Sequence, residues 1–222
     1  MVNSEDQILV LDHLTVDYAG HPPKRAVDDV SFSVVRGQCV GVVGGSGCGK
    51  TTIAKTLIGL EQPTAGRILF DGFDISLLDA EGRRKYRHDV QMVFQDTLGA
   101  LNPRMRIGTA LREVLRVHRN NEFQEERELD ACVCELLDKV ELPAELKTRF
   151  PHEVSGGQRQ RVGIARALAA NPRLLIADEP VSALDVAAQA QMPKMLRKLL
   201  DSTGLTTLFI AHDIPVVRYL SQ

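Results

Sequence analysis

The sequence has no tryptophan, and only 5% of its residues are aromatic. It also lacks any apolar run of about eighteen residues, so we expect no segment of it to span a bilayer. Acidic and basic residues nearly balance, and the formal net charge is -2. No global basic field would therefore attract nucleic acid, and nucleic acid is not an expected partner. The opening MVNSEDQILV is acidic and lacks the charged-then-apolar order of a secretion signal, which predicts a protein that is not secreted.

Cysteine is scarce as well. The four cysteines are Cys39, Cys48, Cys132 and Cys134. They do not form CxxC pairs spaced with histidines, so the pattern does not favour a zinc site. The composition indicates reduced thiols in a cytosolic protein. With 44% hydrophobic and 25% charged residues among 222, the chain has the composition of a globular domain, with room for an inserted subdomain.

Glycine is concentrated in VGVVGGSGCGKTTIAKTLIGL, residues 40–60. Because glycine costs stability in regular structure, this stretch needs bare backbone. Gly44, Gly49, Lys50 and Thr51 fit the P-loop pattern, with a strand-like run before them and a helix-like run after them. Backbone N–H groups would curl around phosphate oxygens at the helix N-terminus. Lys50 would reach the β- and γ-phosphates, and the Thr51 hydroxyl would bind Mg²⁺.

Two acids end the apolar run LLIADEP. Such a run is typical of a strand buried on both faces of a parallel sheet, and ligands of open α/β sheets lie at the carboxyl ends of their strands. Asp178 would hold Mg²⁺, and Glu179 would polarise the water that attacks the γ-phosphate. Alone, the pair could equally be solvated acids; beside a P-loop, the nucleotide interpretation is favoured.

A second glycine pair opens a predicted helix in VSGGQRQR, residues 154–161. This is again an anion-binding design, although one P-loop already serves one triphosphate. A second such site makes sense if it completes a nucleotide site on another subunit. The alternative is an ordinary helix N-cap at Ser155.

Alternating and helical patterns predict the remaining elements. Strands are expected at residues 7–20, 26–44, 66–75, 173–180 and 204–213, with turns at Arg36-Gly37 and Asp71-Gly72. Helices are expected at residues 51–60, 105–119, 123–142, 155–172 and 187–204. Pro193 lies inside the last of these, so we expect a kink or a helix restart there. The basic run RRKYRH, residues 83–88, is interpreted as a solvated face in preference to a nucleic-acid patch.

Six motifs in the same order make the sequence resemble the nucleotide-binding domain of ABC transporters over nearly its whole length. GGSGCGKTT matches the Walker A motif, LLIADE matches Walker B, and VSGGQ matches the signature, with Val154 where leucine is usual. VFQD matches the Q-loop, SALD the D-loop and IAHD the switch histidine. The resemblance implies an α/β fold, a P-loop NTPase core with a mostly parallel sheet and an antiparallel β subdomain. A helical subdomain would be inserted at about residues 97–165.

The resemblance also implies site residues. Two such domains would face head to tail, with each ATP between the Walker A loop of one and the signature of the other. Residues implied to contact nucleotide are Tyr18, Gly44, Gly45, Ser46, Gly47, Cys48, Gly49, Lys50, Thr51, Thr52, Ser155, Gly156, Gly157, Gln158 and Asp185.

Several of these residues have implied roles. Tyr18 would stack on adenine, and Asp185 would act across the dimer interface. Glu179, His212 and Gln95 would be the catalytic residues, His212 contacting the γ-phosphate. Mg²⁺ would be held by Thr51, Gln95 and Asp178, and Gln95 would link the site to the helical subdomain. ATP would close the dimer, and hydrolysis would reopen it.

A finer resemblance is to the dipeptide, oligopeptide and nickel importer branch, carried by MVFQDTLGALNPRMRIG and by residues 151–186. The branch implies two transmembrane permease subunits, a second ABC ATPase subunit in a homo- or heterodimer, and an extracytoplasmic solute-binding protein. The chain would then lie peripherally on the cytoplasmic face of the inner membrane. The solute is not specified by the sequence.

The sequence ends ten residues after His212, where this family usually continues, so we expect a chain that lacks part of its C-terminal region. Two other functions remain open. One is a non-transport ABC-type ATPase, although only a small helical subdomain separates Gln95 from the signature. The other is a catalytically inactive nucleotide-binding module.

Overall fold

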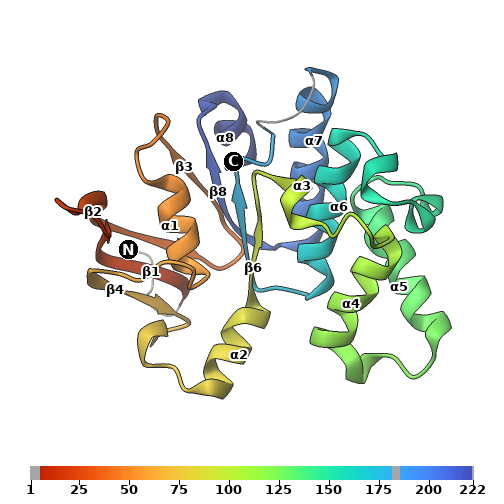
Figure 1. Ribbon diagram of the computed structural model, residues 1–222, viewed down its shortest axis with the longest axis horizontal. Helices are drawn as coiled ribbons and strands as arrows, with labels where there is room; N and C mark the ends of the chain where they lie inside the picture. The colour runs from red at the N-terminus through yellow and green to blue at the C-terminus, as the bar shows by residue number, and fades with distance from the viewer. Residues whose placement is uncertain (1–5, 182–185, 222) are drawn as a thin grey trace. The chain divides into compact units, whose positions relative to one another are not determined.

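The computed structural model describes residues 6–181 and 186–221. These residues divide into two compact units (Figure 1). Unit 1 holds the residues up to 92, then 173–178 and those from 204 onward. Unit 2 holds residues 93–172 and the described part of 179–203. The helical insertion expected at about residues 97–165 falls inside unit 2, which extends beyond it.

An antiparallel sheet occupies one side of unit 1, in the order β2-β1-β4-β5. Its strands are β1 (Gln7–Tyr18), β2 (Lys24–Val35), β4 (Ala65–Phe70) and β5 (Phe73–Asp74). The expected turn at Asp71-Gly72 joins β4 to β5, and both turn residues adopt a positive φ. Leu9 and Leu11 are buried in the first half of β1, and Leu14 and Val16 in its second half, after a register shift between Leu11 and Leu14. The buried positions thus change from Leu9 and Leu11 to Leu14 and Val16 along the strand, and the irregular pairing with β2 accommodates this change.

The second sheet has the order β3-β8-β7-β6. Its strands are β3 (Cys39–Val43), β6 (Val90–Val93), β7 (Leu174–Asp178) and β8 (Thr206–Ala211). β8 runs parallel to both β3 and β7. Every residue of β7 and of β8 is buried, as expected for a strand covered on both faces. The strands predicted at residues 26–44 are therefore confirmed, but β2 and β3 belong to different sheets, and the turn between them leads from one sheet to the other.

Three α-helices complete unit 1: α1 (Lys50–Leu57), α2 (Ala80–Asp89) and α8 (Ile214–Leu220). A short 3-10 helix, η2 (Ile75–Leu77), leads into α2. Ile53, Ala54 and Leu57 of α1 are buried in the same core cluster as β1 and β7. α2 is the element that carries the run RRKYRH; Asp79 caps its N-terminus, and its Tyr86 is buried in the core.

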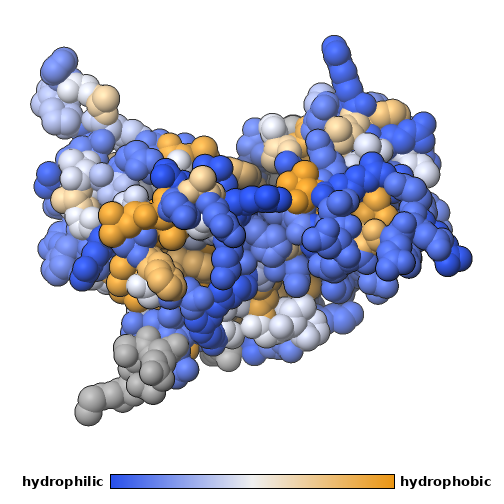
Figure 2. Space-filling model, turned by 90° about the horizontal axis from the view of Figure 1, so that it is seen from below, coloured by the Kyte–Doolittle hydropathy of each residue, from blue (hydrophilic) through white to orange (hydrophobic). Residues whose placement is uncertain are grey.

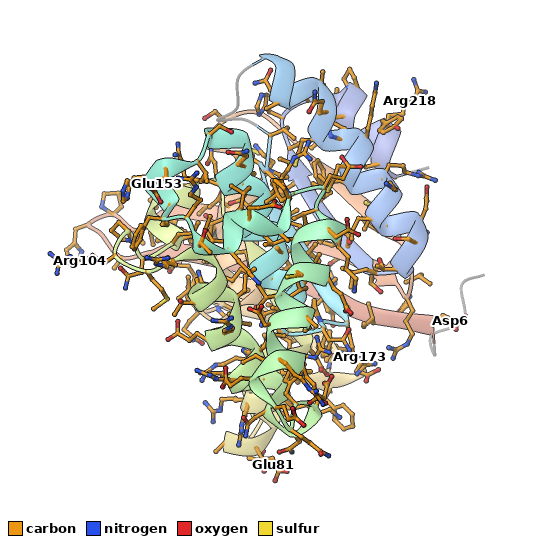
Figure 3. The ribbon with its side chains drawn as sticks, turned by 90° about the vertical axis from the view of Figure 1, so that its right-hand side faces the viewer. Asp6, Glu81, Arg104, Glu153, Arg173 and Arg218 are labelled. Atoms are coloured by element: carbon orange, nitrogen blue, oxygen red, sulfur yellow. The ribbon has the colours of Figure 1, made fainter. Side chains whose placement is uncertain are left out.

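Unit 2 is helical in its described residues. Its α-helices are α3 (Thr97–Ala100), α4 (Ile107–Arg119), α5 (Glu126–Lys139), α6 (Gly156–Ala169) and α7 (Val186–Thr203). Short 3-10 helices lie at η3 (Asn120–Glu122), η4 (Ala144–Thr148) and η5 (Pro151–Glu153). α4, α5 and α6 pack together through buried residues such as Leu111, Leu137 and Ile164. Charged side chains extend from these helices into solvent (Figure 3), which explains their amphipathic sequence pattern.

Of the two outcomes expected at Pro193, the helix restart is wrong, and the kink stays a prediction. α7 runs from Val186 to Thr203 with Pro193 inside it. Proline has no N–H, so one i→i−4 hydrogen bond is missing while the buried face of the helix holds it together. That face includes Met192, Met195 and Leu196, each with at most 3% of its surface exposed. Burial of this face thus outweighs the local cost of the proline. Among the described residues, no helix is both long and apolar enough to cross a membrane.

Candidate functional site

The glycine-rich loop after β3 turns the chain into α1. Gly47 and Gly49 adopt φ values of 76° and 98°, in the left-handed region that glycine enters without steric cost. Gly49 is also the N-cap of α1, and a Cβ on it would overlap the carbonyl oxygen of Ala26 in β2. The loop therefore needs glycine at residue 49 for two independent reasons, its conformation and the close approach of β2.

Lys50 begins α1 and folds back over the loop. Its Nζ donates to the carbonyl oxygens of Gly44 and Gly45, both at 2.8 Å, and lies 3.9 Å from Cys48 Sγ. Only 6% of the residue is exposed. The ammonium group is thus held by backbone dipoles at the N-terminus of a helix, inside a loop of small residues. This arrangement presents a fixed positive charge together with backbone N–H groups, which suits a phosphate.

Thr51 and Asp178 bring the two predicted motifs of unit 1 together. Thr51 Oγ1 donates to Asp178 Oδ1 at 3.3 Å. Asp178 is the last residue of β7 and is 2% exposed, so the carboxylate sits at the carboxyl end of a fully buried strand. A hydroxyl and a carboxylate oxygen at this separation are the hard oxygen ligands that Mg²⁺ prefers, and the phosphates of a nucleotide could supply further oxygens. The residues present therefore fit a Mg²⁺–nucleotide complex.

Tyr18 and His212 approach the same region of unit 1 from different strands. The Tyr18 hydroxyl, at the end of β1, lies 3.0 Å from Thr52 Oγ1 in α1. His212 is exposed and directly follows β8, whose last residue Ala211 pairs with Val43 of β3. His212 and the P-loop thus leave neighbouring parallel strands at the same edge of the sheet.

Gln95 and Glu179 meet within unit 2. Gln95 Nε2 donates to Glu179 Oε2 at 3.2 Å, although the two residues are 84 positions apart. Glu179 is half-buried and has a φ of 46°, a left-handed conformation that costs a non-glycine residue about 1–2 kcal/mol. Such strain is typical of functional positions, where the surrounding structure imposes it.

The signature residues form the N-terminus of α6. Ser155 is the N-cap: its Oγ accepts from the Gln158 N–H at 3.2 Å, while Gln158 Oε1 accepts from the Ser155 N–H at 2.9 Å. This is a complete capping box. A Cβ on Gly157 would lie 3.0 Å from the Cβ of Ala188 in α7, so a small residue is needed there. The N-cap interpretation and the ligand interpretation are compatible, since Ser155 remains exposed.

The remaining predicted residues are placed as follows. Gly45, Ser46 and Cys48 are exposed in the P-loop. Asp185 lies outside the described residues. Sequence reasoning missed Ala26, whose carbonyl confines Gly49, because a contact between a strand and a distant loop has no local signal.

The P-loop lies between a strand and a helix, and a buried aspartate ends a second parallel strand. These features define a P-loop nucleotide-binding protein. The chain belongs to the ABC transporter family, because the model of that family, described as "ABC transporter", matches residues 27–182. The α/β fold class expected from the sequence is confirmed.

The chain is similar in sequence to ATP-binding proteins of oligopeptide transport. The oligopeptide transport ATP-binding protein AppF of Bacillus subtilis is 51% identical over 199 residues, which cover 89% of this chain and 60% of AppF. The oligopeptide transport ATP-binding protein OppF of the same organism is 46% identical over 201 residues, covering 89% and 65%. The chain thus spans about three fifths of the length of these relatives.

Among solved structures, the dimeric post-hydrolysis state of the ATP-binding cassette MJ0796, bound to ADP and Pi, is similar with a TM-score of 0.81 and 32% identity. The likeness covers 95% of this chain and 90% of that one.

Proposed function

We propose that this chain is the ATP-binding and ATP-hydrolysing subunit of an ABC import system. The cargo class is a small solute, a peptide or nickel-type ligand, in keeping with the oligopeptide transport names of its relatives. The observation that carries the proposal is the hydrogen bond between Thr51 and Asp178 beside the P-loop, because it sets two oxygen ligands next to a buried ammonium group. This combination suits a triphosphate with its metal ion.

In this mechanism the P-loop binds the phosphates first. Lys50 exchanges its bonds to the Gly44 and Gly45 carbonyls for bonds to the β- and γ-phosphate oxygens, so the cost of desolvating the ammonium is met before ATP arrives. Thr51 and Asp178 would hold Mg²⁺, and the ion would supply positive charge to offset that of the phosphate oxygens. Tyr18, at the end of β1, provides a ring against which adenine can stack.

Hydrolysis requires a group that orients the attacking water. We assign this role to the Glu179 carboxylate, which would accept a hydrogen bond from the water that attacks the γ-phosphate. Gln95 Nε2 donates to the Glu179 carboxylate at 3.2 Å and would be a ligand of Mg²⁺ when the ion is bound. His212 contacts the γ-phosphate from the end of β8, and Asp185 acts across the interface between two subunits.

Each site is completed by a second copy or a related subunit. Ser155, Gly156, Gly157 and Gln158 of that subunit contact the γ-phosphate through the exposed N-terminus of α6. ATP thereby closes the dimer, and its hydrolysis opens it. Two transmembrane permease subunits carry the solute and hold the chain at the cytoplasmic face of the inner membrane. A solute-binding protein outside the cytoplasm delivers the solute to them.

The test is the ATPase activity of the purified chain with Mg²⁺, measured across protein concentration beside Glu179→Gln. We expect specific activity to rise with concentration, because the site is composite. We expect Glu179→Gln to lose activity by about 100-fold or more, the usual contribution of a positioned general base. ATP binding should persist in this variant.

Glu81→Gln is the matched control, because Glu81 is an exposed carboxylate in the first turn of α2. It should hydrolyse ATP like the wild type. Full activity in Glu179→Gln, or specific activity independent of concentration, would contradict the proposal. ATP binding without any hydrolysis at any concentration would identify the chain as an inactive nucleotide-binding module.

A further inference from the structure

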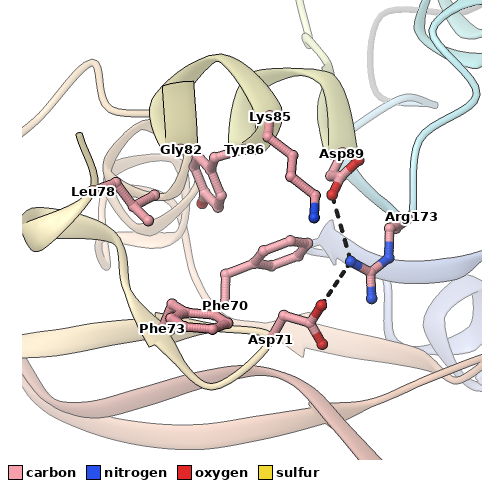
Figure 4. Close-up of a pocket in the computed structure, with 9 residues that line it drawn as sticks. All are labelled: Phe70, Asp71, Phe73, Leu78, Gly82, Lys85, Tyr86, Asp89 and Arg173. Atoms are coloured by element: carbon pink, nitrogen blue, oxygen red, sulfur yellow. Dashed lines mark hydrogen bonds and ion pairs between the residues drawn. The ribbon is translucent and has the colours of Figure 1, made fainter. Parts of the chain in front are cut away.

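Unit 1 contains a cavity away from the P-loop (Figure 4). It is formed by β4, β5, α2 and the residue before β7. Its volume is about 220 Å³. The lining residues are Phe70, Asp71, Phe73, Leu78, Gly82, Lys85, Tyr86, Asp89 and Arg173. None of them is among the predicted nucleotide-site residues. Arg173 directly precedes β7, whereas Asp178 is the last residue of that strand. The cavity is therefore separate from the site described above.

Three aromatic side chains, those of Phe70, Phe73 and Tyr86, line the cavity. Phe70 and the buried Tyr86 pack edge to face, with ring centroids 5.2 Å apart. Tyr86 donates its hydroxyl hydrogen to the Leu57 carbonyl, so its ring is fixed in place. Phe73 stands at the rim with 69% of its surface exposed. Hydrophobic residues also gather on part of the face shown in Figure 2. An exposed phenyl beside an apolar hollow is a common sign of a binding surface.

The two carboxylates at one end of the cavity, Asp71 and Asp89, already have ion-pair partners. Arg173 Nη1 donates to Asp71 Oδ2 at 2.7 Å and to Asp89 Oδ2 at 3.5 Å. Arg36 also pairs with Asp71, and His88 Nδ1 lies 3.0 Å from Asp89 Oδ1. These pairs lock both carboxylates, and the Arg173 guanidinium lies over the Phe70 ring at 5.7 Å. A cationic ligand would thus find no carboxylate available at this end.

Lys85 differs from these groups. Its side chain descends from α2, and its ammonium points into the hollow (Figure 4). Within the part of the chain that the structure describes, no carboxylate lies within ion-pair distance of it. Of the other basic residues on this helix, Arg83 and Arg87 line a different hollow. Lys85 is therefore the group of this cavity that suits an anionic ligand, and the nearby apolar walls would strengthen the attraction between them.

We propose that this cavity binds a small carboxylate with an apolar, preferably aromatic, body. The ring packs against Phe70, Phe73 and Tyr86, and the carboxylate pairs with the Lys85 ammonium. The size fits this class: a cavity of about 150 Å³ holds benzene, and drug-sized ligands need about 300 Å³ or more. The proposal also gives Lys85, in the basic run of α2, a function, which the nucleotide site leaves unexplained.

The test uses three probes of one shape: 3-phenylpropionate, 3-phenylpropan-1-ol and 3-phenylpropylamine. Binding to the purified chain is measured by saturation-transfer NMR titration, with and without ATP. We expect the carboxylate to bind at least tenfold more tightly than the alcohol, and the amine more weakly still. ATP should not displace it. The result is independent of hydrolysis, so it can fail or succeed separately from the proposed ATPase.

Two variants locate the site. Lys85→Met removes the ammonium and keeps the apolar stem, and Phe73→Ala removes an exposed ring whose loss should not affect folding. Each substitution should weaken the binding of 3-phenylpropionate at least tenfold. Lys194→Met, an exposed lysine in unit 2, is the matched control and should bind like the wild type. The proposal is overturned if no probe binds, if the alcohol binds as well as the acid, or if Lys85→Met binds normally.

Discussion

Thr51 Oγ1 donates a hydrogen bond of 3.3 Å to Asp178 Oδ1 across 127 positions of sequence. The hydroxyl belongs to the second residue of the helix that follows the P-loop, and the carboxylate belongs to the last residue of a strand whose five residues are all buried. The bond therefore fixes the relative position of the two motifs on which the proposed nucleotide chemistry depends. Removing either partner leaves the other polar group without this bond at the edge of the core.

Thr51→Ala should lose the Mg²⁺-dependent part of ATP binding. The phosphates would still contact Lys50 and the backbone of the loop, so binding without Mg²⁺ should change little. Titration of a fluorescent ATP analogue with and without Mg²⁺ measures the difference. Thr51→Ser keeps the hydroxyl and should behave like the wild type. Equal Mg²⁺ dependence in Thr51→Ala and the wild type would remove Thr51 from the metal site.

Gly49→Ala should destabilise unit 1 by about 1–3 kcal/mol or abolish its folding. The new Cβ would overlap the Ala26 carbonyl, and the φ of 98° would be strained besides. Gly45→Ala is the matched control, because a Cβ there meets nothing within 4 Å. Urea unfolding compares the two variants. Comparable stability of both would show that the loop moves away from β2 at little cost.

Alkylation of Cys48 should block ATP binding. Cys48 is exposed in the P-loop, whereas the other three cysteines are half-buried. A maleimide adduct would fill the space between the loop and Lys50 Nζ, which is 3.9 Å from the sulfur. ATP should slow the modification, and Cys48→Ala should be resistant to the reagent. Complete labelling of Cys48, shown by mass spectrometry, with unchanged ATP affinity would refute the expectation.

Asp71→Asn should reduce the dependence of stability on acid pH. The hydrogen bond from Arg173, and then that from Arg36, hold the pKa of Asp71 below its usual 3.8, although burial acts in the opposite direction. A lowered folded-state pKa contributes stability that is fully present above pH 3.8 and is lost as the pH falls through the folded value.

The gap in unfolding free energy between wild type and Asp71→Asn should therefore be widest near neutral pH and should shrink below about pH 4. Urea unfolding at several pH values measures it. A gap that stays constant, or widens, on acidification would show that the Arg173 pair contributes nothing through ionisation.

Pro193→Ala should stabilise the chain by up to about 3 kcal/mol, the cost of an interior proline. Alanine restores the missing N–H in α7 and fits any helical position. A thermal melt checks the gain, with Gln189→Ala at an exposed position of the same helix as the control. A lower melting temperature in Pro193→Ala would mean that packing of the buried ring outweighs the lost hydrogen bond.

The sequence determined the local features of this protein. The glycines, Lys50 and Thr51 specified the P-loop because such a loop needs residues without side chains, at fixed spacing from a lysine. Mainly apolar runs specified β7 and β8, because a strand buried on both faces does not alternate between apolar and polar residues. Alternation in β1 and the helical spacing of α4, α5 and α6 were equally readable, since each repeats over a few residues.

Only the tertiary structure decided the long-range pairs. Gln95 meets Glu179, Thr51 meets Asp178, and Ala26 confines Gly49, each across many residues. No local pattern encodes such contacts, because they depend on which strands become neighbours and in what register. The same reason explains why β2 and β3, consecutive in the chain, lie in different sheets. It also explains Pro193, whose local helix-breaking tendency is outweighed by the burial of the helix face around it.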